Sequence, residues 1–176
     1  NQIVFLGNSI TAEGGNWAEK LNYTNIRNRG IAGDVTDGVL ARIDEIIYFK
    51  SKAVFLLIGI NDLWNFSPGI PSTKYISNNI LKIAKEIKKG SPETQVYVQT
   101  ILPTAKSIFV ESINKINNTI KSKSSKFNFT VIDLHSHFEN NDGLIKKELT
   151  TDGIHLNSKG YQVWIEIVRP LISNLK

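Results

Sequence analysis

Ser9 and His155 are the two residues of this sequence whose pairing would support nucleophilic catalysis. A serine hydroxyl becomes a strong nucleophile when a neighbouring imidazole takes its proton. A carboxylate on the other ring nitrogen then fixes the tautomer and stabilises the imidazolium. Asp152 lies three residues before His155, a spacing that lets one turn of chain place both side chains on the same side. Together these three residues predict acyl transfer through a Ser-His-Asp triad.

Acyl transfer also needs hydrogen-bond donors for the oxyanion of its tetrahedral intermediate, each contributing about 3 kcal/mol. The candidates are the backbone amides of Ser9 and Gly33 and the side-chain amide of Asn61. Gly33 has no Cβ, so its backbone can approach a substrate closely. Taken singly, Gly33 and Asn61 fit ordinary turn or cap residues, and His155 fits a structural histidine. The combination of these residues, rather than any one of them, favours a catalytic site.

Strands must carry these residues to one place, because the loops that follow parallel strands emerge at one edge of a sheet. Continuous apolar runs at 3–6 and 53–58 are typical of strands covered on both faces. Less apolar strands are predicted at 24–29, which we expect near a sheet edge, at 95–101 and at 129–134. Ser9, Gly33 and Asn61 follow the first three strands in chain order, so we expect them to meet at one edge.

Segments with helical spacing of apolar residues separate these strands. They are predicted at 16–21, from Asp34 or Thr36 to 47, from Ser72 or Thr73 to 89, at 107–122, and from Asn157 or Ser158 onward, with Pro170 shortening or kinking the last helix. The alternation predicts one three-layer α/β/α domain of flavodoxin-like type over residues 1–176, with a five-stranded parallel sheet.

Composition sets limits on the partners of the chain. The apolar runs, such as 53–58, are too short to cross a bilayer, so we expect no membrane span. The net charge of +5 comes from scattered lysines without interleaved aromatics, which favours a solvated basic surface over a nucleic-acid site. The absence of cysteine excludes disulfides and thiolate metal sites. The compartment stays open: cytoplasmic, or periplasmic or secreted if an upstream signal peptide was removed. The oligomeric state also stays open.

Four short blocks appear in the chain in a fixed order. They are Gly7-Asn8-Ser9-Ile10, Gly30-Ile31-Ala32-Gly33-Asp34, Gly59-Ile60-Asn61-Asp62 and Asp152-Gly153-Ile154-His155. With these blocks the chain resembles the SGNH hydrolases, also called the GDSL esterase and lipase family, over essentially its whole length. The second block and Ile101-Leu102-Pro103 look most like the branch with platelet-activating-factor acetylhydrolase-like and carbohydrate acetylesterase-like members.

The resemblance implies a role for each matching residue, and it implies the flavodoxin-like fold. Ser9 would be the nucleophile, His155 the base, and Asp152 its partner. Gly33 and Asn61 would be oxyanion donors, and no metal or organic cofactor would be needed. The chain departs from the family name at Asn8, where the family has Asp. We expect Asn8 to keep the backbone hydrogen bonds of the turn, and its effect on the electrostatics of the site stays open.

Other residues near the blocks are weaker candidates for function. Trp17 and Trp64, the latter followed by Asn65 and Phe66, fit either a platform for a sugar or acyl chain or ordinary packing. With Asp34, these two tryptophans are the candidate substrate-binding residues. His135 and His137 fit a metal pair with Asp133 or an alternative base, although their spacing after a strand is more typical of a loop exit.

The sequence therefore predicts a serine esterase that removes a small acyl group, most simply acetyl, from an oxygen ester on a carbohydrate or related small molecule. One alternative is a lysophospholipase or thioesterase for longer acyl chains. Another is a non-catalytic carbohydrate-binding module on the same fold.

Overall fold

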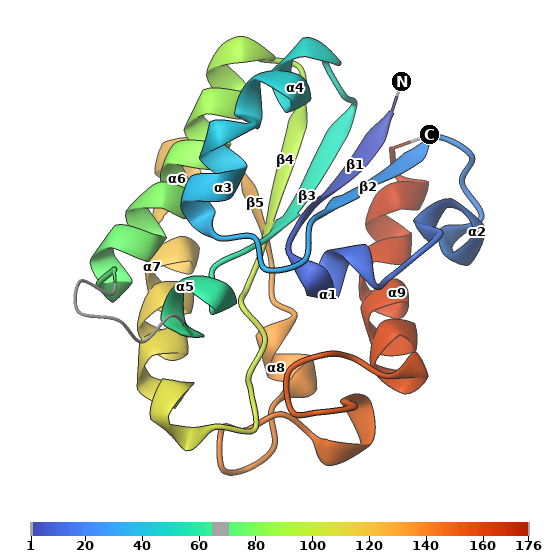
Figure 1. Ribbon diagram of the computed structural model, residues 1–176. Helices are drawn as coiled ribbons and strands as arrows, with labels where there is room; N and C mark the ends of the chain where they lie inside the picture. The colour runs from blue at the N-terminus through green and yellow to red at the C-terminus, as the bar shows by residue number, and fades with distance from the viewer. Residues whose placement is uncertain (1, 65–70, 176) are drawn as a thin grey trace.

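Five parallel strands form the central sheet of the protein (Figure 1), and their order is β2-β1-β3-β4-β5. The structure is a computed structural model that describes residues 2–64 and 71–175. The strands are β1 (Ile3–Gly7), β2 (Ile26–Gly30), β3 (Ala53–Leu57), β4 (Gln95–Gln99) and β5 (Thr130–Ile132). This arrangement confirms the predicted five-stranded parallel sheet. The strand order reverses at β1, so the carboxyl ends of β1 and β3 form the switch point where such folds bind ligands.

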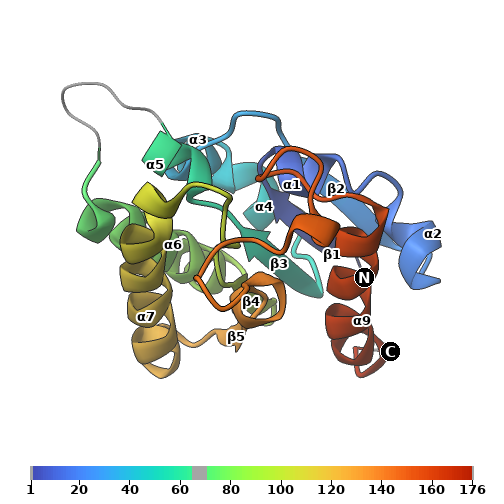
Figure 2. The same ribbon diagram turned by 90° about the horizontal axis from the view of Figure 1, so that it is seen from below.

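Helices cover both faces of the sheet (Figures 1 and 2). One face carries α2 (Trp17–Leu21) and α9 (Ser158–Ser173), which contact each other. The opposite face carries α3 (Thr36–Ala41), α4 (Ile43–Tyr48), α6 (Thr73–Gly90) and α7 (Val110–Phe127). Short elements fill the connections: α1 (Ser9–Ala12), α5 (Ile60–Trp64), η1 (Ser107–Phe109), α8 (His135–Phe138) and η2 (Lys147–Leu149). In the described ranges, no helix combines the length and apolar character needed to cross a membrane.

Burial follows the predicted ranking of the strands. Every residue of β1 and β3 is buried, as expected for strands with neighbours on both sides and helices on both faces. β2 lies at one edge of the sheet, and most of its residues are only partly buried, which explains its polar composition. The two apolar runs thus mark interior strands of the sheet, and the loops that carry Ser9 and Asn61 follow them.

The helices differ from the predictions in three places. The helix expected up to residue 47 breaks into α3 and α4 at Arg42, whose φ of −115° and ψ of 16° are not helical. Neither Asp34 nor Thr36 caps α3: Val35 occupies the N-cap position, and the carboxylate of Asp62 accepts the Thr36 amide instead. Pro170 does not shorten α9, because it lies in the last turn, where a missing amide costs one hydrogen bond.

The core on the α2 and α9 side is aromatic. Trp17 is 1% exposed; its ring stacks on Phe5 at 4.4 Å between centroids and meets Trp164 edge-on at 4.8 Å. Its indole nitrogen donates to the carbonyl of Thr11 at 3.0 Å. This enclosure corrects the expectation that Trp17 contacts the substrate. The residue packs α2 onto the sheet, which is the alternative that the sequence left open.

Candidate active site

Ser9, His155 and Asp152 form a continuous chain of hydrogen bonds at the carboxyl edge of the sheet. The hydroxyl Oγ of Ser9 lies 3.0 Å from Nε2 of His155, and Nδ1 of His155 lies 2.7 Å from Oδ2 of Asp152. Ser9 and His155 are 146 residues apart in the chain, and only the fold brings them together. This is the geometry that a hydroxyl nucleophile, a base and an orienting carboxylate require.

The turn from Asp152 to His155 sets the orientation of the imidazole. Oδ1 of Asp152 accepts the backbone amides of Ile154 at 2.9 Å and His155 at 2.8 Å, which leaves Oδ2 for the ring. Burial tends to raise the pKa of the Asp152 carboxyl, but the hydrogen bonds from the His155 ring and from these amides lower it to about 2. The carboxylate is therefore ionised at neutral pH and is placed to accept a hydrogen bond from Nδ1 of His155.

Ser9 is held at the first position of α1, directly after β1. Asn8 precedes it in extended conformation, and its Oδ1 accepts the backbone amide of Ile10 at 3.1 Å. Asn8 thus keeps the turn as the sequence predicted. The backbone amide of Ser9 is among the first of the helix, where amides have no intrahelical acceptor, so it is available to an oxyanion.

The two other candidate oxyanion donors lie in the loops after β2 and β3. Gly33 has a φ of +77°, and a Cβ built there would meet no described atom within 4 Å. The positive φ therefore explains why residue 33 is a glycine, and the space that a Cβ would occupy is open. Asn61 donates one Nδ2 hydrogen to the carbonyl of Asp34 at 2.9 Å. That bond fixes its amide beside the Gly33 loop and leaves its second hydrogen free to donate.

A buried carboxylate links these two loops, and the sequence analysis missed it. Asp62 follows Asn61, and its carboxylate accepts the Thr36 amide at 3.0 Å and the Thr36 hydroxyl at 2.5 Å. Asn79 donates to the same hydroxyl at 3.0 Å. Burial raises the pKa of Asp62, while the hydrogen bonds from Thr36 oppose that shift. Nothing in the local sequence distinguishes Asp62 from a turn residue, because its partner lies 26 residues away.

Asp34 serves the scaffold rather than the substrate. Its side chain is only 8% exposed, and its Oδ2 lies 2.6 Å from Nη2 of Arg42. The same guanidinium donates to the carbonyl of Gly7 at 3.3 Å, which ties the Gly33 loop to the end of β1. A carboxylate engaged in this way is not free to bind a substrate, which corrects the prediction for Asp34.

Trp64 ends α5 and stays a candidate for substrate contact. Its partly buried ring packs against Phe109 at 5.1 Å, and the ammonium of Lys106 lies 3.8 Å from the ring centre. The neighbouring aromatic and amide residues of the prediction, Asn65 and Phe66, lie outside the described residues.

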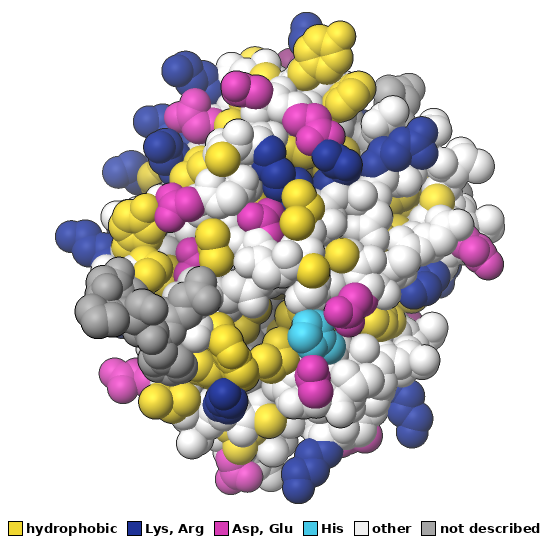
Figure 3. All heavy atoms as spheres, in the orientation of Figure 1, with side chains coloured by type: hydrophobic (Ala, Val, Ile, Leu, Met, Phe, Trp, Pro, Cys, Tyr) yellow, Lys and Arg dark blue, Asp and Glu magenta, His cyan; other side chains and the backbone are white. Residues whose placement is uncertain are grey.

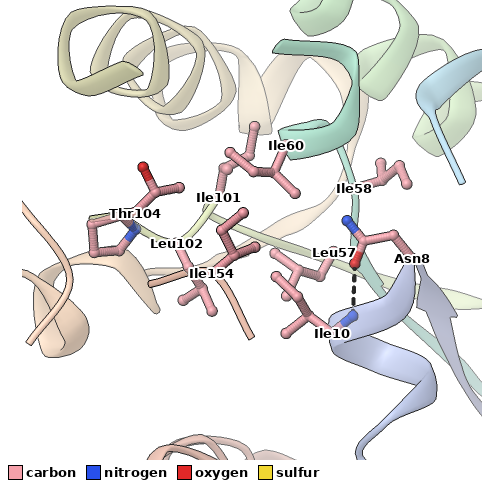
Figure 4. Close-up of a pocket in the computed structure, with 10 residues that line it drawn as sticks. Asn8, Ile10, Leu57, Ile58, Ile60, Ile101, Leu102, Thr104 and Ile154 are labelled. Atoms are coloured by element: carbon pink, nitrogen blue, oxygen red, sulfur yellow. Dashed lines mark hydrogen bonds between the residues drawn. The ribbon is translucent and has the colours of Figure 1, made fainter. Parts of the chain in front are cut away.

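A small apolar pocket opens beside the triad (Figure 4). Its volume is about 10 Å³, room for about one water-sized group. Asn8 and Ile10, which flank Ser9, and Ile154, which precedes His155, contribute to the wall. The remaining lining residues are Leu57, Ile58, Ile60, Ile101, Leu102, Pro103 and Thr104. In Figure 3 a hollow lined with hydrophobic side chains lies beside a histidine that has acidic side chains on two sides.

Glu13 is a second residue that the sequence analysis missed. Its Oε1 lies 3.8 Å from Nε2 of His155, and its side chain is 52% exposed. It also lines a groove of about 510 Å³ between the α1–α2 connection and α9, whose surface is more apolar than polar. The other lining residues are Lys20, Thr151, Leu156, Asn157, Ser158, Tyr161, Gln162 and Ile165. The nucleophile and base thus lie between a small apolar pocket and a larger groove of mixed lining.

The first histidine after β5, His135, is engaged away from the triad. The ring nitrogens of His135 lie 2.9 Å from the carbonyl of Ile101 and 3.0 Å from the carboxylate of Glu139. Asp133 pairs with Lys121 at 2.7 Å, and together with its bond from Thr100 this lowers the pKa of Asp133 against the opposing effect of burial. Within the described ranges, no group of three acidic, His or Cys side chains is arranged to hold a metal ion.

The chain is similar in sequence and in fold to several known proteins. Platelet-activating factor acetylhydrolase IB subunit alpha2 of Rattus norvegicus is 26% identical over 160 residues, which cover 88% of this chain and 66% of that protein. The chain thus spans a little under two thirds of that relative. A crystal structure of a GDSL-like lipase from Bacteroides thetaiotaomicron superposes with a TM-score of 0.87 at 21% identity, covering 99% of this chain and 89% of that one.

An acetyl xylan esterase shares the same fold. Its crystal structure gives a TM-score of 0.81 at 20% identity, covering 98% of this chain and 100% of that one. At the level of sequence, the profile of the GDSL-like Lipase/Acylhydrolase family matches residues 5–163. That match includes all four blocks around Ser9, Gly33, Asn61 and His155. The chain therefore belongs to the GDSL-like lipase/acylhydrolase family, whose members are carboxylic ester hydrolases.

Proposed function

We propose that the protein is a serine esterase that removes a short acyl group, in the first place acetyl, from an oxygen ester of a carbohydrate or a related small polyol. The observation that carries the proposal is the hydrogen-bonded chain from Ser9 through His155 to Asp152. This arrangement activates a hydroxyl, and the acyl group of an ester is its natural target.

The first half of the reaction transfers the acyl group to the enzyme. Oγ of Ser9 attacks the carbonyl carbon of the ester, and its proton moves to Nε2 of His155. The oxyanion accepts hydrogen bonds from the Ser9 and Gly33 amides and from Nδ2 of Asn61. The bond between the carbonyl carbon and the alcohol oxygen then breaks. The alcohol leaves with the proton from Nε2, and the acyl group stays on Ser9.

The second half returns the enzyme to its starting state. A water molecule gives a proton to Nε2 of His155 as its oxygen attacks the acyl carbon. The bond to Oγ breaks, Ser9 recovers its proton from His155, and the carboxylic acid departs. Asp152 stays ionised throughout and stabilises the imidazolium that forms in each half.

The size of the apolar pocket supports a short acyl group. Its volume of about 10 Å³ accommodates a group near the size of a methyl, whereas a long acyl chain needs a continuous channel. The relative and the fold neighbour named above are called an acetylhydrolase and an acetyl xylan esterase, which points the same way.

The polar groups of the larger groove support a hydroxyl-rich alcohol. The groove begins at Glu13, next to the nitrogen that protonates the leaving oxygen, and hydroxyl, amide and charged side chains are among its lining residues. A sugar presents hydroxyls that exchange hydrogen bonds with such groups. Glu13 also places a negative charge there, which disfavours alcohols that carry a phosphate close to the ester.

The test is hydrolysis of p-nitrophenyl acetate, butyrate and octanoate, and of acetylated xylose, by the wild type and by Ser9→Ala. We expect kcat/KM to fall steeply from acetate to octanoate, and Ser9→Ala to lose at least about 10³-fold on acetate. Ser107→Ala, at an exposed serine on η1, is the matched control. A Ser9→Ala enzyme as active as the wild type would overturn the triad. A preference for octanoate would instead favour a lysophospholipase or thioesterase.

A further inference from the structure

Asn8 carries a buried hydrogen-bond donor without a partner. Its side chain is 1% exposed, and its Oδ1 is used by the Ile10 amide, which identifies the other terminal atom as nitrogen. No described residue accepts a hydrogen bond from that Nδ2. A buried amide donor left unpaired is costly, and native proteins have few of them. The unpaired donor therefore calls for an acceptor that is not part of the described chain.

The pocket beside Ser9 is where that acceptor would lie. Asn8 is one of its lining residues, and Figure 4 shows its amide nitrogen turned away from Ile10 towards the space between the surrounding isoleucines. Thr104 is the other lining residue with a polar side chain, and its hydroxyl is engaged with the backbone of Lys106. The remaining lining side chains are apolar, so the Asn8 amide is the feature that gives this pocket hydrogen-bonding selectivity.

Resting on the esterase function proposed above, we infer that Asn8 selects acyl groups that carry an oxygen on the carbon next to the carbonyl, such as a hydroxyacetyl group. That oxygen occupies the pocket and accepts a hydrogen bond from Nδ2, while the carbon next to the carbonyl lies at the pocket mouth. A propionyl group has the same shape but puts a methyl against the donor and leaves it unpaired. A site built to bond a polar atom discriminates strongly against the isostere that lacks it.

The family residue Asp would bond the same group in a different way. It keeps an oxygen for the Ile10 amide but replaces the donor Nδ2 with a second acceptor, to which a hydroxyacetyl hydroxyl donates its own hydrogen. The substitution of Asn for Asp therefore changes the hydrogen-bonding character of the pocket while it preserves the turn that presents Ser9.

The experiment compares phenyl hydroxyacetate with phenyl propionate and uses phenyl acetate as the reference substrate. The kcat/KM of each ester is divided by its rate constant for hydroxide hydrolysis, which removes the higher intrinsic reactivity of the hydroxyacetyl ester. We expect the normalised ratio of hydroxyacetate to propionate to be about five to ten in the wild type. In Asn8→Leu, whose side chain cannot form the hydrogen bond, it falls to about one, whereas in Thr104→Val it stays as in the wild type.

The ratio is taken within each enzyme, so a general loss of activity in a variant does not alter it. The wild-type ratio tests the inference even if Asn8→Leu fails to fold. A wild type that hydrolyses phenyl acetate with a normalised ratio of one or less overturns this inference and leaves the esterase function standing. A wild type that hydrolyses none of the three esters overturns both.

Discussion

The hydroxyl of Thr36 donates to the buried carboxylate of Asp62 at 2.5 Å, and the amide of Thr36 donates to the same group at 3.0 Å. These bonds join the start of α3 to α5, and so join the loop that holds Gly33 to the residue that follows Asn61. Asp34 strengthens the connection through its carbonyl, which accepts Nδ2 of Asn61, and through its ion pair with Arg42. The two candidate oxyanion donors thus belong to one cross-linked unit.

Thr36→Val should destabilise the protein by about 2 kcal/mol. The substitution keeps the shape of the side chain but removes one hydrogen bond to a buried charged group, and such bonds are worth about 1.5 to 3 kcal/mol. Urea denaturation measures the change, and Thr36→Ser, which restores the hydroxyl, should recover most of it. If Thr36→Val were as stable as Thr36→Ser, the hydrogen bond from the Thr36 hydroxyl to Asp62 would not contribute to the stability of the protein.

Asn61→Ala tests the oxyanion site more directly. Removal of one donor typically lowers kcat by about 10²- to 10³-fold, because the bond is strongest in the transition state. We expect KM for p-nitrophenyl acetate to change little. Stability should fall by no more than about 1.5 kcal/mol, from the lost bond to the carbonyl of Asp34. Asn114→Ala, on the exposed side of α7, is the control. A kcat within fivefold of the wild type would show that Asn61 is not an oxyanion donor.

The sequence predicted the parts of the site that local pattern encodes. The apolar runs of β1 and β3 required burial on both faces, and a parallel sheet then had to bring the loops after them to one edge. For that reason the sequence alone places Ser9 and Asn61 at the same edge of the sheet. Trp17 could not be assigned in the same way, because an aromatic residue near a sheet edge packs inward or outward according to partners such as Phe5, 12 residues earlier in the chain.

The contacts of Asp34 and Glu13 depend on partners that are distant in the sequence, so the pattern of residue types does not predict them. The predicted substrate contact of Asp34 is wrong because its carboxylate pairs with Arg42. The position of the Arg42 guanidinium depends on the helix break at that residue, which the spacing of apolar residues does not predict. Glu13 was missed because its distance from His155 depends on how α1 ends against the loop before α9. In each case the deciding contact joins side chains from different segments of the chain, and sequence spacing does not encode it.

Asp152→Asn should lower kcat by about 10³- to 10⁴-fold, because the amide no longer holds the correct tautomer of His155. The wild-type pKa of Asp152 is lowered from 3.8 to about 2, so its carboxylate stays ionised above about pH 4. The stabilisation that this lowered pKa provides is present above pH 3.8 and is lost as the pH falls through about 2. Since the side chain is 53% exposed, we expect less than about 1 kcal/mol.

Denaturation of the wild type and Asp152→Asn at several pH values checks this sign. The stability difference in favour of the wild type should shrink as the pH falls from about 5 to about 2. A difference that grows over that range would contradict the lowered pKa of the carboxyl.

Glu13→Gln should change which alcohols the enzyme accepts. The Glu13 carboxylate lies 3.8 Å from the nitrogen that protonates the leaving oxygen, so an anionic leaving group is repelled. Lys20, the cation of the same groove, is turned to the carbonyl of Gly14 and the ring of Tyr161. We expect kcat/KM for 4-acetoxybenzoate relative to phenyl acetate to rise about threefold in Glu13→Gln at low salt, and less at high salt. Glu111→Gln, on α7, is the control. An unchanged ratio at low salt would show that the charge of Glu13 does not reach the leaving group.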